Sequence, residues 1–219
     1  MKHKYYDKAS IVDEAFNTLR TNIQFSEVDK KLKTIVVTSA SPSEGKTTVA
    51  VRLARSFAQT SRVLVVDCDL RNPSVPKAAG VQSNMGLTHI LVQHVDPREV
   101  LVEDENYEKL DYILAGPVPP NPAVLVGTDA MKRFVARVSD AYDYVIIDSA
   151  PVGLFSDAAI LSTFTDGVIL VADHGATTKA EFQNAKERIE HVRGNVLGAV
   201  LNRVDISTKR GAKNYYNSR

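Results

Sequence analysis

The stretch TIVVTSASPSEGKTT, residues 34–48, contains a complete transition from strand to helix. Its first part, residues 34–38, is an unbroken run rich in β-branched residues, which is the composition of a strand buried on both faces. Its last three residues begin a longer segment, residues 46–59, in which large apolar residues recur every four positions. This spacing indicates an amphipathic helix. A buried strand that leads directly into a helix is the building unit of an α/β sheet.

Similar apolar runs recur along the rest of the chain. They predict buried strands at residues 63–66, 144–147, 168–172 and 196–201, with a weaker candidate at residues 110–114. A second helical pattern covers residues 178–193, and a third precedes the first strand at about residues 10–25, where Ser10 to Asp13 have the form of a capping box. Strands that alternate with helices predict an α/β fold, with a doubly wound, mostly parallel sheet, helices on both faces and right-handed crossovers.

The composition limits the class of protein. Of the 219 residues, 44% are hydrophobic and 24% are charged, which is typical of a globular chain. The longest apolar run, residues 168–172, is far shorter than the roughly 18 residues of a membrane helix, so we expect a cytoplasmic protein. The single cysteine, Cys68, excludes an internal disulfide and a cysteine-based zinc site, and we expect a buried, inert thiol. A net charge of +1 argues against a nucleic-acid partner.

The chain shows no internal linker that would divide it into two domains. We expect one domain over residues 1–205 and a flexible tail over residues 206–219, which holds four basic residues and no acidic one. Two segments rich in proline and glycine, residues 71–98 and 115–128, are expected to form loops and short helices at the carboxyl edge of the sheet.

Residues 40–48 have the pattern of a phosphate-binding loop (P-loop), with Ala40 where a glycine usually stands. Backbone N–H groups at a helix N-terminus cradle phosphate oxygens, and Gly45 lets the backbone approach them. Lys46 reaches the β- and γ-phosphates, and the Thr47 hydroxyl ligates Mg²⁺. The alternative is an ordinary strand-to-helix turn. We predict a P-loop NTPase type of fold that binds ATP and Mg²⁺. The expected nucleotide-binding residues here are Ser43, Glu44, Gly45, Lys46, Thr47 and Thr48.

Acidic residues end two other predicted strands. Asp67 and Asp69 follow the strand at residues 63–66, and Asp148 follows the strand at residues 144–147. Ligands of open α/β sheets bind at the carboxyl ends of the strands, so we expect these carboxylates to meet at the phosphates and the metal. Asp148 is expected to hold Mg²⁺, whereas one of the other two could serve the metal and the other could accept a proton. The alternative is that these acids only cap turns.

Four segments together resemble motifs of the bacterial tyrosine kinases (BY-kinases) that are encoded with capsular and exopolysaccharide genes. They are the P-loop at residues 41–48, an acidic motif at residues 65–74, the segment at residues 145–151 and a proline-rich loop at residues 115–122. The resemblance covers about residues 10–205. It implies an ATP-dependent protein-tyrosine kinase that autophosphorylates its C-terminal tail and regulates capsule or exopolysaccharide synthesis and export.

The resemblance also assigns roles to residues. It implies that Asp67 takes the tyrosyl proton and that Asn202 contacts adenine. The expected catalytic set is then Lys46, Asp67, Asp69 and Asp148, and the expected metal set is Thr47, Asp69 and Asp148. Family members usually end in a cluster of phosphorylated tyrosines, and this tail offers Tyr215 and Tyr216 as the expected phosphorylation sites.

Assembly and recruitment are implied in the same way. The family carries Glu-x-x-Arg-x-x-Arg in its N-terminal helix as a contact between subunits of a ring. Glu14 and Arg20 match this pattern, whereas Asn17 replaces the first arginine, so a solvated polar face is the alternative. The resemblance implies a homo-oligomer, protein tyrosine substrates, and a membrane activator protein of a polysaccharide export system that recruits the kinase to the inner face of the cell membrane.

Two other functions compete with the kinase. A partitioning-type P-loop ATPase would act as a nucleotide switch, but such proteins generally carry an extra lysine at the start of the P-loop, where residues 39–41 have none. They also lack a tail that bears tyrosines. A non-catalytic regulator would keep the fold and bind nucleotide, and the intact Lys46, Asp67 and Asp148 count against it.

Overall fold

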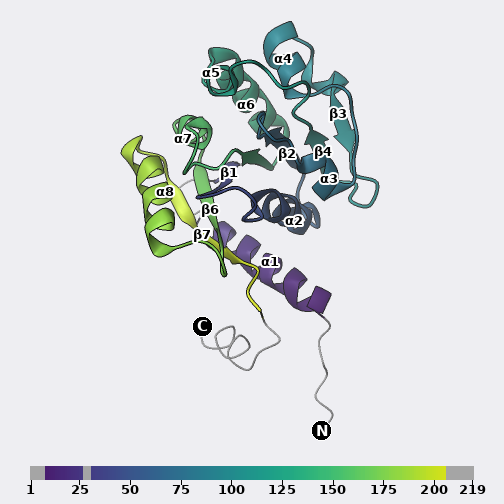
Figure 1. The fold of residues 1–219 in the computed structure, drawn as a ribbon. Coiled ribbons are helices and arrows are strands. Elements are labelled where there is room, and N and C mark those ends of the chain that lie inside the picture. Colours follow the sequence, from purple (N-terminus) through teal and green to yellow (C-terminus); the bar gives the residue numbers. More distant parts are fainter. Residues whose placement is uncertain (1–7, 27–30, 206–219) are drawn as a thin grey trace.

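A computed structural model describes residues 8–26 and 31–205 of the chain. Within these residues the strands form one seven-stranded sheet in the order β3-β4-β2-β5-β1-β6-β7 (Figure 1). The strands are β1 (Thr34–Ser39), β2 (Val63–Cys68), β3 (Leu101–Glu103), β4 (Leu110–Ile113), β5 (Tyr144–Ser149), β6 (Gly167–Asp173) and β7 (Val196–Asn202). Neighbouring strands are parallel except for the antiparallel pair β3–β4 at one edge.

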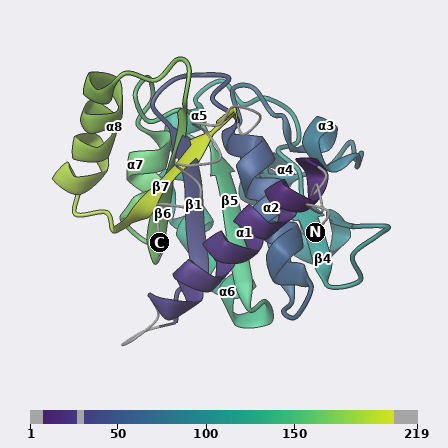
Figure 2. The ribbon, with the colours of Figure 1, turned by 90° about the horizontal axis from the view of Figure 1, so that it is seen from below.

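Helices cover both faces of the sheet. They are α1 (Lys8–Phe25), α2 (Lys46–Ala58), α3 (Val75–Ala79), α4 (Leu87–Gln93), α5 (Pro122–Val126), α6 (Asp129–Ala141), α7 (Asp157–Ser162) and α8 (Lys179–His191), with a 3₁₀ turn at Pro97–Glu99. Helices α1, α2 and α3 pack on one face, and α4, α6, α7 and α8 pack on the other. Figure 2 shows α1 and α2 lying across the first of these faces.

Two apolar clusters explain the unbroken strand runs. Ile35 and Val37 of β1 belong to the cluster under α1 and α2, whereas Val36 between them belongs to the cluster on the opposite face. All three side chains are fully buried. Because both faces are covered, every position of a central strand favours an apolar residue, and the strand does not alternate between apolar and polar residues.

The strand register brings the acidic residues together. Asp67 of β2 pairs with Asp148 of β5, and Asp148 also pairs with Val37 of β1 on its other side. The P-loop follows β1 directly, so it lies at the same carboxyl edge of the sheet. This is the place where ligands bind in open α/β sheets.

The predicted α/β sheet and its strands are confirmed, with two differences. Strand β3 was not expected, since three half-exposed residues give no apolar run. The capping box at Ser10 is wrong because α1 begins at Lys8, and Lys8 and Ala9 are good helix formers that extend the helix past Ser10. Among the described residues, we find no helix with both the length and the hydropathy that crossing a bilayer requires.

Candidate active site

The P-loop leads into helix α2, whose first backbone N–H groups are not capped by a side chain. Gly45 precedes α2 in a left-handed conformation, with φ of 92°, and α2 has no side-chain N-cap hydrogen bond. A Cβ atom at Gly45 would lie 2.1 Å from Asn202 Nδ2, so a side chain cannot fit there without a shift. The free N–H groups and the positive end of the helix dipole therefore form an anion site.

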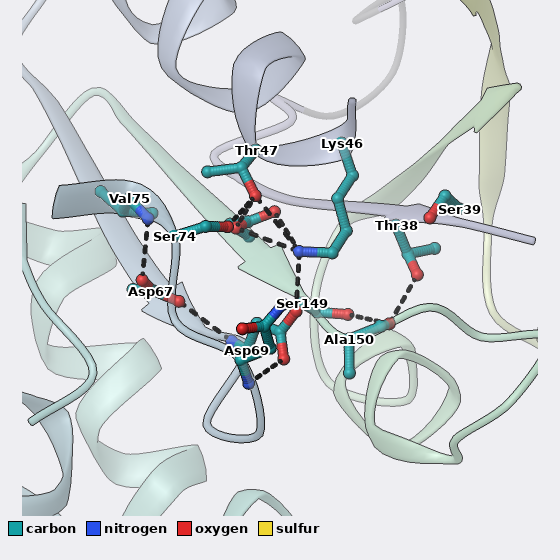
Figure 3. Close-up of polar contacts among 12 residues, drawn as sticks. Thr38, Ser39, Lys46, Thr47, Asp67, Asp69, Ser74, Val75, Ser149 and Ala150 are labelled. Carbon is teal, nitrogen blue, oxygen red and sulfur yellow. Dashed lines mark hydrogen bonds and ion pairs between the residues drawn. The ribbon is translucent and has the colours of Figure 1, made fainter. Parts of the chain in front are cut away.

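Lys46 and Thr47 open helix α2 and point into the carboxyl edge of the sheet (Figure 3). Lys46 Nζ lies 2.8 Å from Asp69 Oδ2 and 3.4 Å from Asp148 Oδ2. It also donates a hydrogen bond to Thr47 Oγ1, at 3.2 Å. Thr47 Oγ1 in turn donates to Asp148 Oδ2 at 2.6 Å. The predicted convergence of Lys46, Thr47, Asp69 and Asp148 is present.

Asp67 lies beside this group and is held by the backbone. Its Oδ1 accepts a hydrogen bond from the N–H of Asp69 at 3.2 Å, and its Oδ2 accepts one from the N–H of Val75 at 3.1 Å (Figure 3). The side chain is fully buried. These bonds fix the orientation of the carboxyl group of Asp67, which lies in β2. The donors belong to Asp69, just after β2, and to Val75, the first residue of α3.

Burial changes the titration of the acidic residues. Burial and the nearby Asp148 raise the pKa of Asp67 to about 8, against the opposing effect of the Val75 N–H and of Lys46. Burial also raises the pKa of Asp148, to about 6, because Lys46 and Thr47 offset only part of the desolvation. Burial alone would lower the pKa of Lys46, but Asp148 and Asp69 outweigh it and raise that pKa. Asp67 can therefore exchange a proton near neutral pH.

A cleft of about 560 Å³ opens beside this group. Its lining includes Ser43, Gly45, Lys46, Thr47 and Thr48 of the P-loop and α2, Asp69, Asn72 and Ser74 after β2, Phe155 after β5, and the cations Arg71, Lys77 and Arg203. The three aspartates 67, 69 and 148 are buried, so the charges at the open side of the cleft come from the cations. A cleft with this charge fits a polyphosphate.

Glu44, just before Gly45 in the P-loop, contacts Asn202 at the end of β7. The Glu44 carboxylate is buried, and it accepts hydrogen bonds from the Ser41 N–H and from the Thr177 hydroxyl rather than facing the cleft. The Glu44 carbonyl accepts a hydrogen bond from Asn202 Nδ2 at 2.9 Å. The end of β7 is thus tied to the P-loop, and the contact of Asn202 with adenine stays a prediction. Glu44 can contribute to nucleotide binding through its backbone, while its side chain shapes the loop.

The donor set suits magnesium rather than zinc. No group of three or more histidine, cysteine or acidic side chains within residues 8–26 and 31–205 is placed to hold a metal on its own. Mg²⁺ keeps several waters and takes one or two protein oxygens together with substrate phosphates. The Thr47 hydroxyl and the Asp148 carboxylate, beside the anion site of the P-loop, fit that requirement.

Helix α1 places Glu14 and Arg20, the residues expected at a contact between subunits, in different surroundings. Arg20 donates hydrogen bonds to the Ser56 carbonyl and to Gln59 Oε1 of the α2 segment, and Asn17 Oδ1 accepts one from Ser56 Oγ. Glu14 is exposed. Arg20 therefore contacts its own chain here, and the role of Glu14 and Arg20 in an oligomer stays a prediction. Tyr215 and Tyr216 lie outside the described residues.

Two features of the site were not predicted. Ser74 Oγ lies 2.8 Å from Thr47 Oγ1, and because Thr47 donates to Asp148, Ser74 must be the donor of this bond. Asp157, at the start of α7, is fully buried and pairs with Arg71 at 3.1 Å. Ser74 lay within the acidic motif and could have been considered. Asp157 gave no signal, since its partner is 86 residues away in the sequence.

The parallel sheet, the uncapped loop before α2 and the acidic strand ends together define a P-loop nucleotide-binding protein. Residues 32–196 match the family described as an AAA domain. The chain is 39% identical to tyrosine-protein kinase YwqD of Bacillus subtilis (strain 168), over 96% of this chain and 88% of that protein. It is 38% identical to tyrosine-protein kinase CpsD of Streptococcus pneumoniae, over 93% and 90% of the two chains. The kinase domain of Escherichia coli tyrosine kinase ETK superposes with a TM-score of 0.82 at 33% identity, covering 87% of this chain and 74% of that one.

The chain belongs to the bacterial tyrosine-protein kinase family. The resemblance drawn from the motifs is thereby confirmed, and it is favoured over a partitioning-type ATPase, because the similarity to tyrosine kinases extends over nearly the whole chain.

Proposed function

We propose that the chain transfers the γ-phosphoryl group of ATP to tyrosine with the help of Mg²⁺, that it acts on Tyr215 and Tyr216 of its own tail and on other proteins, and that it regulates capsule or exopolysaccharide synthesis and export. The observation that carries this proposal is the position of Asp67. This carboxyl group, whose pKa burial raises to about 8, lies opposite Asp148 on the neighbouring strand, at the carboxyl edge of the sheet. A tyrosine hydroxyl, with a pKa of about 10, needs such a base to lose its proton.

The P-loop binds the phosphates. The uncapped N-terminus of α2 is proposed to bind the phosphate oxygens through its backbone N–H groups, with the ammonium group of Lys46, the first residue of α2, close by. Ser43 and Thr48 line the cleft on its open side. Asn202, fixed to the Glu44 carbonyl, is proposed as the contact to adenine. Positioning by many fixed groups is the main source of rate in phosphoryl transfer.

Thr47, Asp69 and Asp148 are proposed to hold the metal. When bound, Mg²⁺ would neutralise charge on the phosphate oxygens. The chain itself prepares this site, since Ser74 and Lys46 hydrogen-bond Thr47, and Thr47 hydrogen-bonds Asp148.

Asp67 is proposed to accept the phenolic proton. The tyrosine oxygen forms a bond to the γ-phosphorus, the bond from that phosphorus to the bridging oxygen of ADP breaks, and the phenolic proton passes to the Asp67 carboxylate. The two backbone N–H groups that bind Asp67 hold it in place as the carboxylate that accepts the proton. A base whose pKa lies near the working pH is the most effective.

The assembly and location are proposed from the family. We propose a cytoplasmic homo-oligomer, in which Glu14 and Arg20 contribute to the subunit contact, recruited to the inner face of the cell membrane by a membrane activator protein of the polysaccharide export system. The exposed position of Glu14 is compatible with a contact between subunits. The isolated protein should then be weakly active, and full activity without any partner would contradict the dependence on an activator.

The test is to incubate the purified protein with ATP and MgCl₂ and to map phosphotyrosine by mass spectrometry. We expect phosphate on Tyr215 and Tyr216 in the wild type. A variant with both tyrosines changed to Phe should carry no phosphate on its tail. An acceptor peptide that contains tyrosine is added to each reaction, so that kinase activity is still detected when the tail itself is not phosphorylated. Hydrolysis of ATP with no phosphotyrosine on the tail or on the peptide would contradict the kinase function.

A further inference from the structure

Arg71 is a cation of the cleft that the proposed mechanism does not use. It follows β2 two residues after Asp69, and it lines the same cleft as Lys46 and Thr47. Its Nη2 lies 3.1 Å from Asp157 Oδ2, and its guanidinium lies 4.1 Å from the centre of the Phe155 ring. Both partners belong to the segment that follows Asp148 and β5. The side chain thus joins the two loops that carry the acidic residues of the site.

The pairing of Arg71 with Asp157 is incomplete. Asp157 is fully buried, yet its Oδ1 has no hydrogen-bond partner among the described residues, and neither has the buried Nε of Arg71. A buried carboxylate needs a cation, because an uncompensated charge in the interior is costly. Asp157 therefore holds Arg71 in place, while Phe155 supports the planar group from one side. Of the five N–H donors of the guanidinium, this contact uses one.

Lys46 is more fully paired than Arg71 in this structure. Its three N–H groups are directed at Thr47 Oγ1, Asp69 and Asp148. The Arg71 side chain is 29% exposed and lines the cleft, and the contact with Asp157 leaves the other donors of its guanidinium available. Donors that are fixed before the reaction stabilise charge that develops during it, since they need no reorganisation.

We propose that Arg71 is a further catalytic residue, whose guanidinium donates hydrogen bonds to the oxygens of the phosphoryl group during its transfer, and that Asp157 and Phe155 are its positioning residues. The proposal rests on the proposed kinase function. Arg71 exchanges no proton in this role, because its guanidinium stays charged throughout. Bond formation and bond breaking are those described for the transfer from ATP to tyrosine.

The test compares three variants with the wild type: Arg71→Ala, Arg71→Lys and the double variant Arg71→Ala/Asp157→Asn. The double variant matters because Arg71→Ala alone leaves Asp157 buried without its cation and lowers stability. The control is Arg137→Ala, on the surface of α6, where the exposed arginine pairs with the half-buried Asp96. For each protein, kcat and the KM for ATP are measured with an acceptor peptide, ADP affinity is measured by calorimetry, and melting is followed by circular dichroism.

We expect Arg71→Ala to lower kcat by about 100-fold or more, the effect of removing one donor to a developing charge, and to change ADP affinity by less than about threefold. Added guanidinium ion should restore part of the rate in Arg71→Ala and none in Lys46→Met. Arg71→Lys should recover little, because a point charge does not reproduce the planar fork. The double variant should have the same kcat as Arg71→Ala and should melt at a higher temperature than Arg71→Ala.

A kcat for the double variant within about threefold of the wild type would overturn the proposal, and so would a fall in ADP affinity as large as the fall in kcat. The release of inorganic phosphate from ATP is measured in the same proteins. If the wild type hydrolyses ATP but never labels tyrosine, the kinase function fails. The effect of Arg71→Ala on the rate of hydrolysis then still supports or overturns the role of Arg71.

Discussion

Lys46 is the cation that pairs with two buried carboxyl groups of the site, those of Asp69 and Asp148. Its side chain is 9% exposed, and its ammonium group lies 2.8 Å from Asp69 and is also paired with Asp148. Removing one partner of a buried ion pair costs more stability than the pair contributes, since the remaining charge is uncompensated. At the scale of single residues, Lys46 therefore has a structural role in addition to its role toward phosphate.

We expect Lys46→Met to abolish transfer and to lower the melting temperature of the nucleotide-free protein at about pH 8. Without the ammonium group the pKa of Asp148, already raised by burial, rises further, so this carboxyl group takes up a proton more readily as the pH falls. A raised pKa in the folded state favours folding at low pH, and the melting difference from the wild type should shrink at about pH 5.5. Circular dichroism melts measure this, with Lys132→Met on the surface as the control. An equal loss at both pH values would contradict the pairing.

Sequence reasoning identified the residues of the site that follow predicted strands. Asp67 and Asp148 were found because each comes directly after an apolar run, and Lys46 because the P-loop pattern follows another such run; parallel strands bring these positions to one edge. Asp157 could not be found in this way. Its importance comes from burial beside Arg71, and an aspartate at a helix start normally indicates only a favourable interaction with the helix dipole.

At the scale of elements, helix α1 is attached to α2 by polar contacts. Arg20 binds the Ser56 carbonyl and Gln59, and Asn17 accepts a hydrogen bond from Ser56. The sequence predicted the helix but suggested that Glu14, Asn17 and Arg20 act together at its surface. Positions three apart are neighbours on a helix, but side chains six positions apart point in clearly different directions. Arg20 therefore reaches α2, whereas Glu14 stays exposed.

We expect Arg20→Ala to lower the free energy of unfolding by about 1 kcal/mol, the typical net value of a lost hydrogen bond. Glu14→Ala should leave stability unchanged, because Glu14 is exposed. Urea unfolding of both variants gives the free energies, and sedimentation velocity shows whether either variant self-associates less than the wild type. A stability loss for Glu14→Ala equal to that for Arg20→Ala would contradict this division of roles.

At the scale of the whole molecule, the chain leaves the sheet beside the P-loop. Strand β7 runs parallel to β6, and Asn202 at its end binds the Glu44 carbonyl. This direction was predicted from the parallel pattern and is confirmed. About 11 residues separate Val204 from Tyr215, which fully extended reach roughly 36 to 40 Å. Reach alone therefore permits transfer within one molecule or between two.

We expect transfer to the tail to occur between molecules, since a tail that starts beside its own P-loop must reverse sharply to enter the same cleft. The test mixes Lys46→Met protein that has an intact tail with active protein whose Tyr215 and Tyr216 are changed to Phe. Phosphotyrosine on the Lys46→Met chain supports transfer in trans. If that chain stays unlabelled while wild type labels normally, each tail serves its own site.

The central claim is that Asp67 is the base of a tyrosine kinase, and the pH dependence of kcat tests it most directly. The carboxylate form increases as the pH rises through the raised pKa of about 8, so kcat of the wild type should rise with pH over that range. Asp67→Asn should lose this rise and turn over on the order of 10² to 10⁴ times more slowly, with little change in ATP affinity. The control is Asp129→Asn, on the exposed start of α6. If Asp67→Asn kept the wild-type kcat and the same pH profile at saturating ATP, or lost only nucleotide binding, Asp67 would not be the base.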